Sequence, residues 1–358
     1  MALTLVRYLL ATFLGRTALA LAGLALPLSV FDTLAHLNAL LDGGAPVALA
    51  LPAYAGLRLP TLVVLLVPLA VLIGGLLTLI ALVSDQEIVV ARAAGVSTLQ
   101  IAASLLVGAG LIATAHFLFA NHVATETAER LADWQARNFA GLPTPGGQDR
   151  DGLWLASDGT ILWIGHVSED GRELRDLQVI ERDPAGGFAG YLEAEKARFV
   201  DGRWVLQDVR SPLADPDATG APADRGNRFR LDPGRLGSLD ATPEALSFGA
   251  AWAMQGREGF AGRAPRYYRF WAHRKLAQPA SSLVMALLAA PLACQLARRR
   301  RLVLTALATL AAGAVYFGLE RLLVPLGETA VLPPPLAAWA PMIAVGALAV
   351  WRLIMTEA

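Results

Sequence analysis

Few residues of this chain have the types and spacing that catalysis or metal binding requires. The two lysines, Lys196 and Lys275, lie in no glycine-rich phosphate loop, and no nucleophile elbow is present. The histidines show no metal-ligand spacing; they are His36, His116, His122, His166 and His273. We therefore expect a chain that is not an enzyme and holds no metal or cofactor, so that energy for any work comes from another subunit.

One charged stretch, Ser84 to Ser97 (SDQEIVVARAAGVS), interrupts two long apolar runs. Ser84 and Glu87 have the spacing of a helix capping box, and Gly95 stands where a helix would stop. The stretch therefore predicts a short helix outside the hydrocarbon. Glu87 and Arg92 are five residues apart and cannot pair as (i, i+4) neighbours do. Their charges are left either for water, as in ordinary membrane connectors, or for a partner.

Composition indicates a membrane protein, because 55% of the residues are hydrophobic and only 17% are charged. Net charge is zero, which argues against a nucleic-acid partner. Six runs are long enough to cross a bilayer. They are Thr12 to Leu34, Leu57 to Val83, Leu99 to Ala120, Leu276 to Ala297, Leu302 to Leu323 and Leu336 to Leu353.

The acidic residues divide the chain into three parts. Of the 30 Asp and Glu residues, 23 lie between Asn121 and Lys275, so this segment cannot lie in lipid. We expect spans one to three within 1–120, an extracytoplasmic domain over 121–275, and spans four to six within 276–358. The basic run Arg298 to Arg301 predicts a cytoplasmic loop, which places both termini and the Ser84 to Ser97 connector on the same side.

The middle segment predicts a helical extension of the third span over Glu126 to Phe139, followed by strands. Asp-Gly pairs typical of tight turns occur at 158–159, 170–171 and 201–202, beside strand-like residues such as Ile161 to Ile164 and Trp204 to Leu206. Repeated hairpins favour a small all-β sandwich or roll, and Pro212 to Gly237 is expected to be a long loop.

Ionisable residues near the outer ends of spans are candidates for function because they are costly in lipid. Asp32 and His36 end the first span, and Glu320 and Arg321 end the fifth. The alternative is that all four lie at an interface where charge is tolerated, with Glu320 balancing Arg321.

The whole arrangement resembles the LptF/LptG family of lipopolysaccharide export permeases. The likeness rests on three spans, a β-rich insert and three further spans, with SDQEIVVARAAGVS between spans two and three. Matching segments are GLWLASDGTILWIG, AEKARFVDGRWVLQDV, RKLAQPASSLVMALLAAPLA and LGETAVLPPPLAAWAP, so the resemblance covers nearly the whole chain. The connector and the PPPLAAWAP tail are more similar to the G-type subunit than to the F-type subunit.

This resemblance implies a permease subunit of an ABC transporter that extracts lipopolysaccharide from the outer leaflet of the bacterial inner membrane. The implied partners are an F-type permease subunit (LptF), a cytosolic ATPase dimer (LptB) that binds ATP and magnesium, a single-span accessory protein (LptC) and a periplasmic bridge protein (LptA). The connector would be the coupling helix, with Glu87 and Arg92 contacting the ATPase and Gly95 ending the helix.

The resemblance also implies that the insert is a periplasmic β-jellyroll. Trp154, Trp163 and Trp204 are candidates to line its apolar interior, the alternative being an ordinary sandwich core.

Phe31 to Asp42 departs from the family pattern, because it contains Asp32, His36 and Asp42 but no Lys or Arg to meet lipid A phosphates. Arg58 on the second span or Arg321 on the fifth is expected to substitute; alternatively, the headgroup carries fewer phosphates. Our hypothesis is that Arg321 contacts the substrate.

Two other classes of protein remain open at this point. A lipoprotein-release or mechanotransmission permease is expected to have four spans with the insert after the first. This chain is instead predicted to have three spans on each side of the insert. A structural scaffold without transport activity needs only one span to anchor it.

Overall fold

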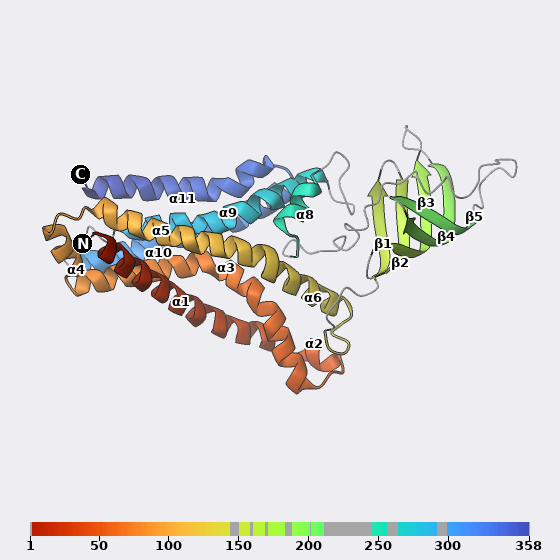
Figure 1. Ribbon diagram of the computed structural model, residues 1–358, viewed down its shortest axis with the longest axis horizontal. Coiled ribbons are helices and arrows are strands. Elements are labelled where there is room, and N and C mark those ends of the chain that lie inside the picture. Colours follow the sequence, from red (N-terminus) through yellow and green to blue (C-terminus); the bar gives the residue numbers. More distant parts are fainter. Residues whose placement is uncertain are drawn as a thin grey trace.

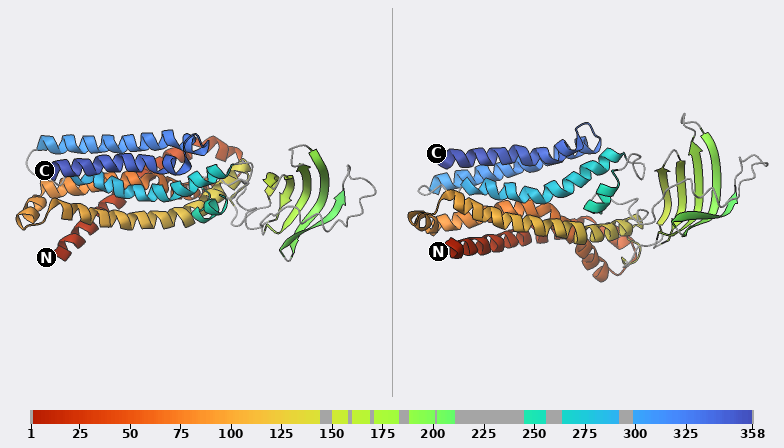
Figure 2. Two further views of the ribbon diagram at one scale, coloured as in Figure 1. Left: turned by 90° about the horizontal axis from the view of Figure 1, so that it is seen from above. Right: turned by 45° about the horizontal axis from the view of Figure 1, so that its top comes forward.

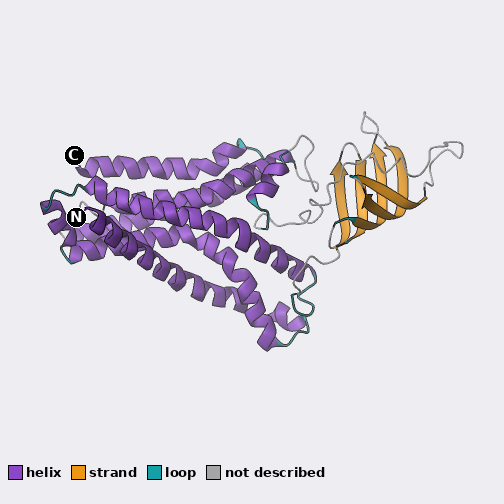
Figure 3. Cartoon of the chain, in the orientation of Figure 1, coloured by secondary structure: helices purple, strands orange, loops and turns teal. Residues whose placement is uncertain are grey.

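The chain folds as a long helical bundle with a β-sheet beyond one end, as the computed structural model shows (Figure 1, Figure 3). The structure describes residues 2–143, 150–157, 160–168, 171–182, 188–200, 202–210, 245–255, 264–291 and 299–357. Both termini lie at the end of the bundle that is distant from the sheet (Figure 1, Figure 2). Helix α4 lies at that same end (Figure 1).

The helical elements before the sheet run almost without interruption. They are α1 (Ala2–Ala35), α2 (Leu37–Asp42), α3 (Val47–Ser84), α4 (Glu87–Ala93), α5 (Thr98–Phe119), the π-helix η1 (Ala120–Ala124) and α6 (Thr125–Ala136). After the sheet come α8 (Phe248–Ala253), α9 (Pro265–Ala289), α10 (Arg299–Glu328) and α11 (Pro334–Glu357). The predicted helical extension of the third span is confirmed by η1 and α6, which continue α5 to Ala136.

Five helical segments among the described residues are long and apolar enough to cross a membrane. They are Val6–Ala35, Val47–Ser84, Leu99–Ala136, Val303–Glu328 and Pro334–Met355. These segments correspond to five of the six predicted spans. Several are longer than the hydrocarbon requires, since the 38 residues of α3 extend over about 57 Å.

The predicted fourth span is recovered only in part. Helix α9 begins at Pro265, well before the expected start at Leu276, and ends at Ala289. Arg274 and Lys275 lie within this helix, which is not among the five apolar segments. Residues 292–298 lie outside the described part of the chain, and with them the end of that predicted span.

Helix α9 is nevertheless the centre of the bundle, because it packs against α3, α5, α10 and α11. Met285, Ala286 and Ala289 are fully buried there, together with Leu72 of α3 and Phe13 of α1. Burial of such side chains contributes about 1.5 to 3 kcal/mol each where water is the reference, but inside a bilayer close packing holds the helices together instead.

Small residues allow α1 and α3 to approach closely. A Cβ added at Gly74 would lie 2.6 Å from Thr17 Cα. Beside this contact, Arg16 Nη1 donates hydrogen bonds to the carbonyl oxygens of Leu77 at 2.6 Å and Thr78 at 3.2 Å. The charged guanidinium of α1 thus binds main-chain carbonyls of α3, so both packing and hydrogen bonds hold the two helices where they cross.

The sheet-facing ends of α3 and α6 are joined by a separate apolar cluster. Trp134 and Tyr54 are fully buried in it, with Leu40, Leu131 and Phe139. Trp134 Nε1 also donates to the Gly141 carbonyl at 3.1 Å. This cluster holds the ends of the two helices in register, at the level where the polar side chains described below lie.

The sheet is an antiparallel meander of five described strands in the order β1-β2-β3-β4-β5. Its strands are β1 (Arg150–Ser157), β2 (Thr160–Val167), β3 (Glu173–Arg182), β4 (Phe188–Val200) and β5 (Arg203–Arg210). Leu162, Ile164, Leu177 and Leu206 form part of a core on one face. The predicted all-β domain between the two helical blocks is therefore present as a sheet. The turn residues Asp158, Gly159, Asp170 and Asp201, and the predicted loop at 212–237, lie outside the described residues.

Candidate functional site

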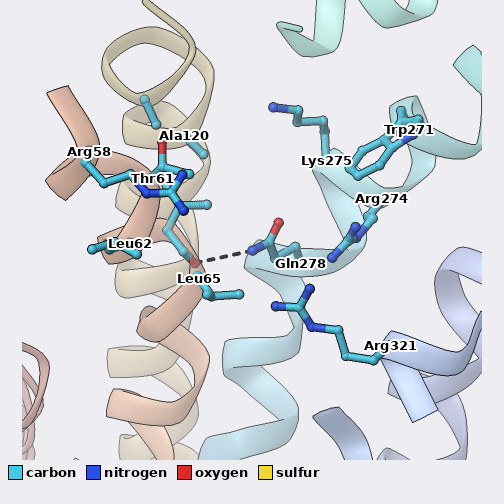
Figure 4. Close-up of a pocket in the computed structure, with 12 residues that line it drawn as sticks. Arg58, Thr61, Leu62, Leu65, Ala120, Trp271, Arg274, Lys275, Gln278 and Arg321 are labelled. Atoms are coloured by element: carbon cyan, nitrogen blue, oxygen red, sulfur yellow. Dashed lines mark hydrogen bonds between the residues drawn. The ribbon is translucent and has the colours of Figure 1, made fainter. Parts of the chain in front are cut away.

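A basic pocket lies between α3, η1, α9 and α10, near the sheet-facing end of the bundle. Its volume is about 220 Å³, and four of the lining residues are cationic: Arg58, Arg274, Lys275 and Arg321. Figure 4 shows α3 and η1 on one side and α9 and α10 on the other, with Arg321 directed into the space between them. Positive charge gathered among apolar helices is costly unless anions compensate it.

Two alanines of the π-helix η1, Ala120 and Ala124, form part of the pocket wall. A π-helix adds a residue to a helical turn, so it changes which side chains face a neighbouring helix, and such bulges occur frequently at functional sites. Opposite, Gln278 Nε2 of α9 donates to the Val64 carbonyl of α3 at 3.3 Å, which links the two sides of the pocket (Figure 4).

Arg58 is held by a hydrogen-bond network that joins α1 and α3. Its Nε donates to Asp32 Oδ2 at 3.1 Å, and the Tyr54 hydroxyl donates to the same oxygen at 2.8 Å. The Tyr54 hydroxyl also lies 2.9 Å from His36 Nδ1. Three of the predicted substrate-path residues, Asp32, His36 and Arg58, are thus brought together. Asp32 fixes Arg58 in place and compensates its charge.

On the other side of the pocket, Arg274 of α9 is held by a side chain of α10. Its Nη2 donates to Glu320 Oε1 at 2.7 Å, and the two side chains are only 13% and 16% exposed. The guanidinium lies over the Trp271 ring, 4.8 Å from the centroid. The alternative in which Glu320 balances Arg321 is wrong, because adjacent residues on a helix point in different directions and Glu320 reaches Arg274 instead.

Arg321 and Arg58, the two residues expected to replace missing basic side chains, line the same pocket. Arg321 is exposed and makes no ion pair or hydrogen bond with any residue the structure describes. Arg274 and Lys275 were not predicted as site residues, because they fall within the segment that was expected to form the insert. The signal was present in the sequence as an Arg-Lys pair followed directly by an apolar run that starts at Leu276.

The connector forms α4, but it does not begin as predicted. Ser84 belongs to α3, whose hydrogen bonding continues from Asp85 N to Ala81 O at 2.8 Å, so Ser84 cannot cap the next helix. Gln86, with a left-handed φ of 61°, precedes α4 and makes no side-chain cap. The capping box occurs instead at the start of α5, where Ser97 and Gln100 bond each other's main chains.

The end of α4 does agree with the sequence analysis. Gly95 has a φ of +86°, Gly95 N bonds Arg92 O, and Val96 N bonds Ala91 O, each at 3.0 Å. This is the Schellman pattern of a helix end. Glu87 and Arg92 are both exposed and do not pair with each other; instead, Glu87 accepts a hydrogen bond from the Tyr8 hydroxyl at 3.0 Å.

The candidate tryptophans do not share one environment. Trp204 is 3% exposed in the sheet core and contacts Phe199, with 5.2 Å between ring centroids. Trp163 lies between Leu162 and Ile164 on β2, so it faces the opposite side, where it borders a groove with Gln178 and Arg210. Trp154 pairs with Trp163 along the backbone, and its side chain lies outside the described structure.

The basic side chains of this pocket can bind anions. Arginines bind phosphate or carboxylate through fixed pairs of N–H donors. Among the described residues no group of three His, Cys, Asp or Glu side chains is placed to hold a metal ion. The pocket is therefore a candidate site for a ligand with a phosphate or carboxylate group and apolar surroundings.

Comparison with known proteins gives one family. The family model described as lipopolysaccharide export system permease LptF/LptG matches residues 7–355. The lipopolysaccharide export system permease protein LptG of Escherichia coli strain K12 is 25% identical over 315 residues, covering 86% of each chain. The protein of the same name from Haemophilus influenzae is 22% identical over 240 residues, covering 66% of each chain.

Proposed function

Because this chain belongs to the LptF/LptG family of lipopolysaccharide export permeases, we propose that it is a G-type permease subunit of an ABC transporter. It extracts lipopolysaccharide from the outer leaflet of the inner membrane and passes it to a periplasmic bridge protein. A separate cytosolic ATPase dimer binds ATP and magnesium and supplies the energy. The observation that carries the proposal is the basic pocket within an apolar helical bundle, which fits a lipid with an anionic headgroup.

In the proposed topology α9 also spans the membrane, as the fourth span along the chain, which brings the number of spans to six. Its polar residues are compatible with this role because neighbouring helices cover them: Ser281 and Ser282 are fully buried, and Arg274 is paired. Both termini and α4 are cytoplasmic, and the sheet is periplasmic. The sheet is one part of a β-jellyroll that joins the periplasmic bridge by edge-to-edge strand pairing.

The proposed partner on the cytoplasmic side is the ATPase, which binds α4. The helix offers Glu87 and Arg92 together with the exposed Val90, while Ile88 is buried in the bundle core. Because one apolar residue anchors this short helix, a movement of the ATPase against α4 is transmitted to α3 and α5 as rigid-body motion. An F-type subunit and a single-span accessory protein are proposed to cover the exposed apolar faces of α1, α10 and α11.

Co-purification from membranes tests the proposed coupling. The wild-type chain and a variant with Glu87→Ala and Arg92→Glu are isolated, and the associated ATPase is quantified. We expect the ATPase with the wild type and its loss from the variant. The matched control is Glu126→Ala with Arg130→Glu on α6, an ion pair in the helix that continues toward the sheet, which should leave the association unchanged. Absence of any ATPase with the wild type would overturn the transporter assignment and favour a scaffold.

A second experiment tests the proposed substrate. A photoreactive residue at Thr61, which lines the pocket, should crosslink lipopolysaccharide in membranes that contain the complete transporter. Arg321→Ala should reduce the crosslink, and Arg130→Ala on α6 should not. Unchanged crosslinking and transport after Arg321→Ala would show that this arginine does not meet the substrate.

A further inference from the structure

The two carboxylates next to the basic pocket are held in different ways. Asp32 accepts hydrogen bonds from both Arg58 and the Tyr54 hydroxyl, so it remains fixed to α3 even when one bond is lost. Glu320 makes its ion pair and hydrogen bond with Arg274 alone among the described residues. Asp32 is therefore held by two donors, whereas the contact of Glu320 depends on a single partner.

Arg274, the partner of Glu320, is incompletely satisfied. A guanidinium has five N–H donors. Arg274 Nε is buried yet has no hydrogen-bond partner among the described residues, while Nη2 bonds Glu320. Buried donors are normally paired, because an unpaired one costs about 1 to 3 kcal/mol. The ion pair with Glu320 thus leaves Arg274 incompletely satisfied, so a ligand with more acceptor oxygens would satisfy this guanidinium better.

One positive charge in the pocket has no counter-anion among the described residues. Four cationic side chains line the pocket. Asp32 pairs with Arg58 and Glu320 pairs with Arg274, whereas Arg321 makes no ion pair with any described residue. A phosphate monoester carries about −1.5 to −2 charges at pH 7 and three acceptor oxygens. Such a group would compensate Arg321, and it offers Arg274 more acceptor oxygens than one carboxylate provides.

We propose that Glu320 is an exchangeable counter-anion, which the phosphate of a phosphorylated lipid displaces from Arg274. Arg321, the next residue on α10, makes the first contact, and Arg274 then turns from Glu320 to the phosphate. Phosphate binding and the ion pair between α9 and α10 are mutually exclusive. This inference rests on the proposed function. It adds that the Glu320 carboxylate competes with the phosphorylated lipid for Arg274, and that the ion pair forms again when the lipid leaves the pocket.

The proposal predicts opposite effects for the two members of one ion pair. Glu320→Gln removes the competing anion, so the pocket should bind the phosphorylated lipid more tightly, by at least about threefold. Arg274→Gln removes the phosphate ligand and should weaken binding by a similar factor. If the pair served only to hold α9 against α10, the two substitutions would disturb the pocket in the same direction.

The test uses the complete transporter in membranes, with the photoreactive residue at Thr61 and limiting lipopolysaccharide. Crosslink yields are compared for the wild type, E320Q, E320D and R274Q, each corrected for the amount of protein in the membrane. The matched control is E328Q, a carboxylate on the same helix that accepts from Trp271 Nε1 at 3.1 Å and does not line the pocket. A parallel series uses lipopolysaccharide whose lipid A phosphates have been removed.

We expect the yield to be highest for E320Q, intermediate for E320D, which keeps a shorter carboxylate, then wild type, and lowest for R274Q. E328Q should equal the wild type, and the gain in E320Q should vanish with the dephosphorylated lipid. A fall in E320Q parallel to that in R274Q overturns the exchange while the transport function stands. A gain that persists without phosphates also overturns it. No crosslink in the wild type refutes the proposed function itself.

Discussion

The Tyr8 hydroxyl of α1 donates a hydrogen bond to Glu87 Oε1, the first residue of α4, at 3.0 Å. The next residue, Ile88, is 2% exposed and packs in the bundle core. Helix α4 is thus attached to α1 through Glu87 as well as continuing from α3. If α4 receives the push of an ATPase, the first span moves with it, in addition to the two spans that the connector joins along the chain.

Tyr8→Phe removes this hydrogen bond and leaves the ring in place. Because the bond is exposed to water, we expect a modest effect: lipopolysaccharide transported per ATP hydrolysed falls by roughly twofold, while the ATPase still co-purifies. The matched control is Tyr191→Phe on β4, which removes a similar bond to Glu193 at 2.5 Å in the sheet. A transport-to-hydrolysis ratio equal to that of the wild type would show that α1 is not driven through Tyr8.

Gly95→Ala should loosen the end of α4. The residue has a φ of +86° and open space around it, so the cost of a Cβ is conformational rather than steric. A left-handed conformation costs a residue other than glycine about 1 kcal/mol, which corresponds to roughly fivefold faster amide hydrogen exchange at Val96. Gly110→Ala in α5, which also has open space but a helical backbone, is the control and should not accelerate exchange. Unchanged exchange in both variants would contradict the role of the glycine.

Local patterns in the sequence predicted the helices well, because a bilayer requires long apolar runs and such runs are visible without any knowledge of packing. The end of α4 was also predictable, since glycine is the residue that a left-handed turn favours. The start of α4 was not. The spacing of Ser84 and Glu87 fits a capping box, but the apolar helix α3 continues through Ser84 and a turn at Gln86 follows.

The pocket could be predicted only in part, because it depends on contacts between distant residues. Arg58 and Asp32 are 26 residues apart, and Arg274 and Glu320 are 46 residues apart. No local spacing encodes such pairs. Arg58 and Arg321 were found because isolated charges in apolar runs are conspicuous. The direction of Glu320 toward α9 followed only from the packing of α10 against it.

Gly74→Ala should separate α1 from α3. The added Cβ would lie 2.6 Å from Thr17 Cα and 2.8 Å from Thr17 N, and backbone atoms cannot rotate away as a side chain does. We expect a loss of about 1 to 3 kcal/mol in the free energy of unfolding, because the hydrogen bonds from Arg16 to α3 are strained as well. Thermal denaturation of the purified chain in detergent measures the loss.

Gly23→Ala on α1 is the matched control for this crossing. A Cβ at Gly23 meets nothing within 4 Å, so the variant should be as stable as the wild type or slightly more stable. Equal denaturation temperatures for the Gly74 and Gly23 variants would show that α1 yields at the crossing without cost.

Trp204→Ala and Trp163→Ala should affect the sheet differently. Trp204 is 3% exposed in the core and contacts Phe199, so its truncation leaves a cavity and costs about 3 to 5 kcal/mol. Trp163 lies on the opposite face beside the groove, where truncation leaves no closed cavity and the expected loss is at most about 1.5 kcal/mol.

Protease resistance of the β domain in the intact, membrane-embedded chain distinguishes the two variants. In rising urea, Trp204→Ala should be cleaved at a much lower concentration than the wild type, and Trp163→Ala at nearly the same concentration as the wild type. Equal sensitivity of the two would mean that both faces of the sheet are covered by further structure, which is the arrangement that a closed sandwich requires.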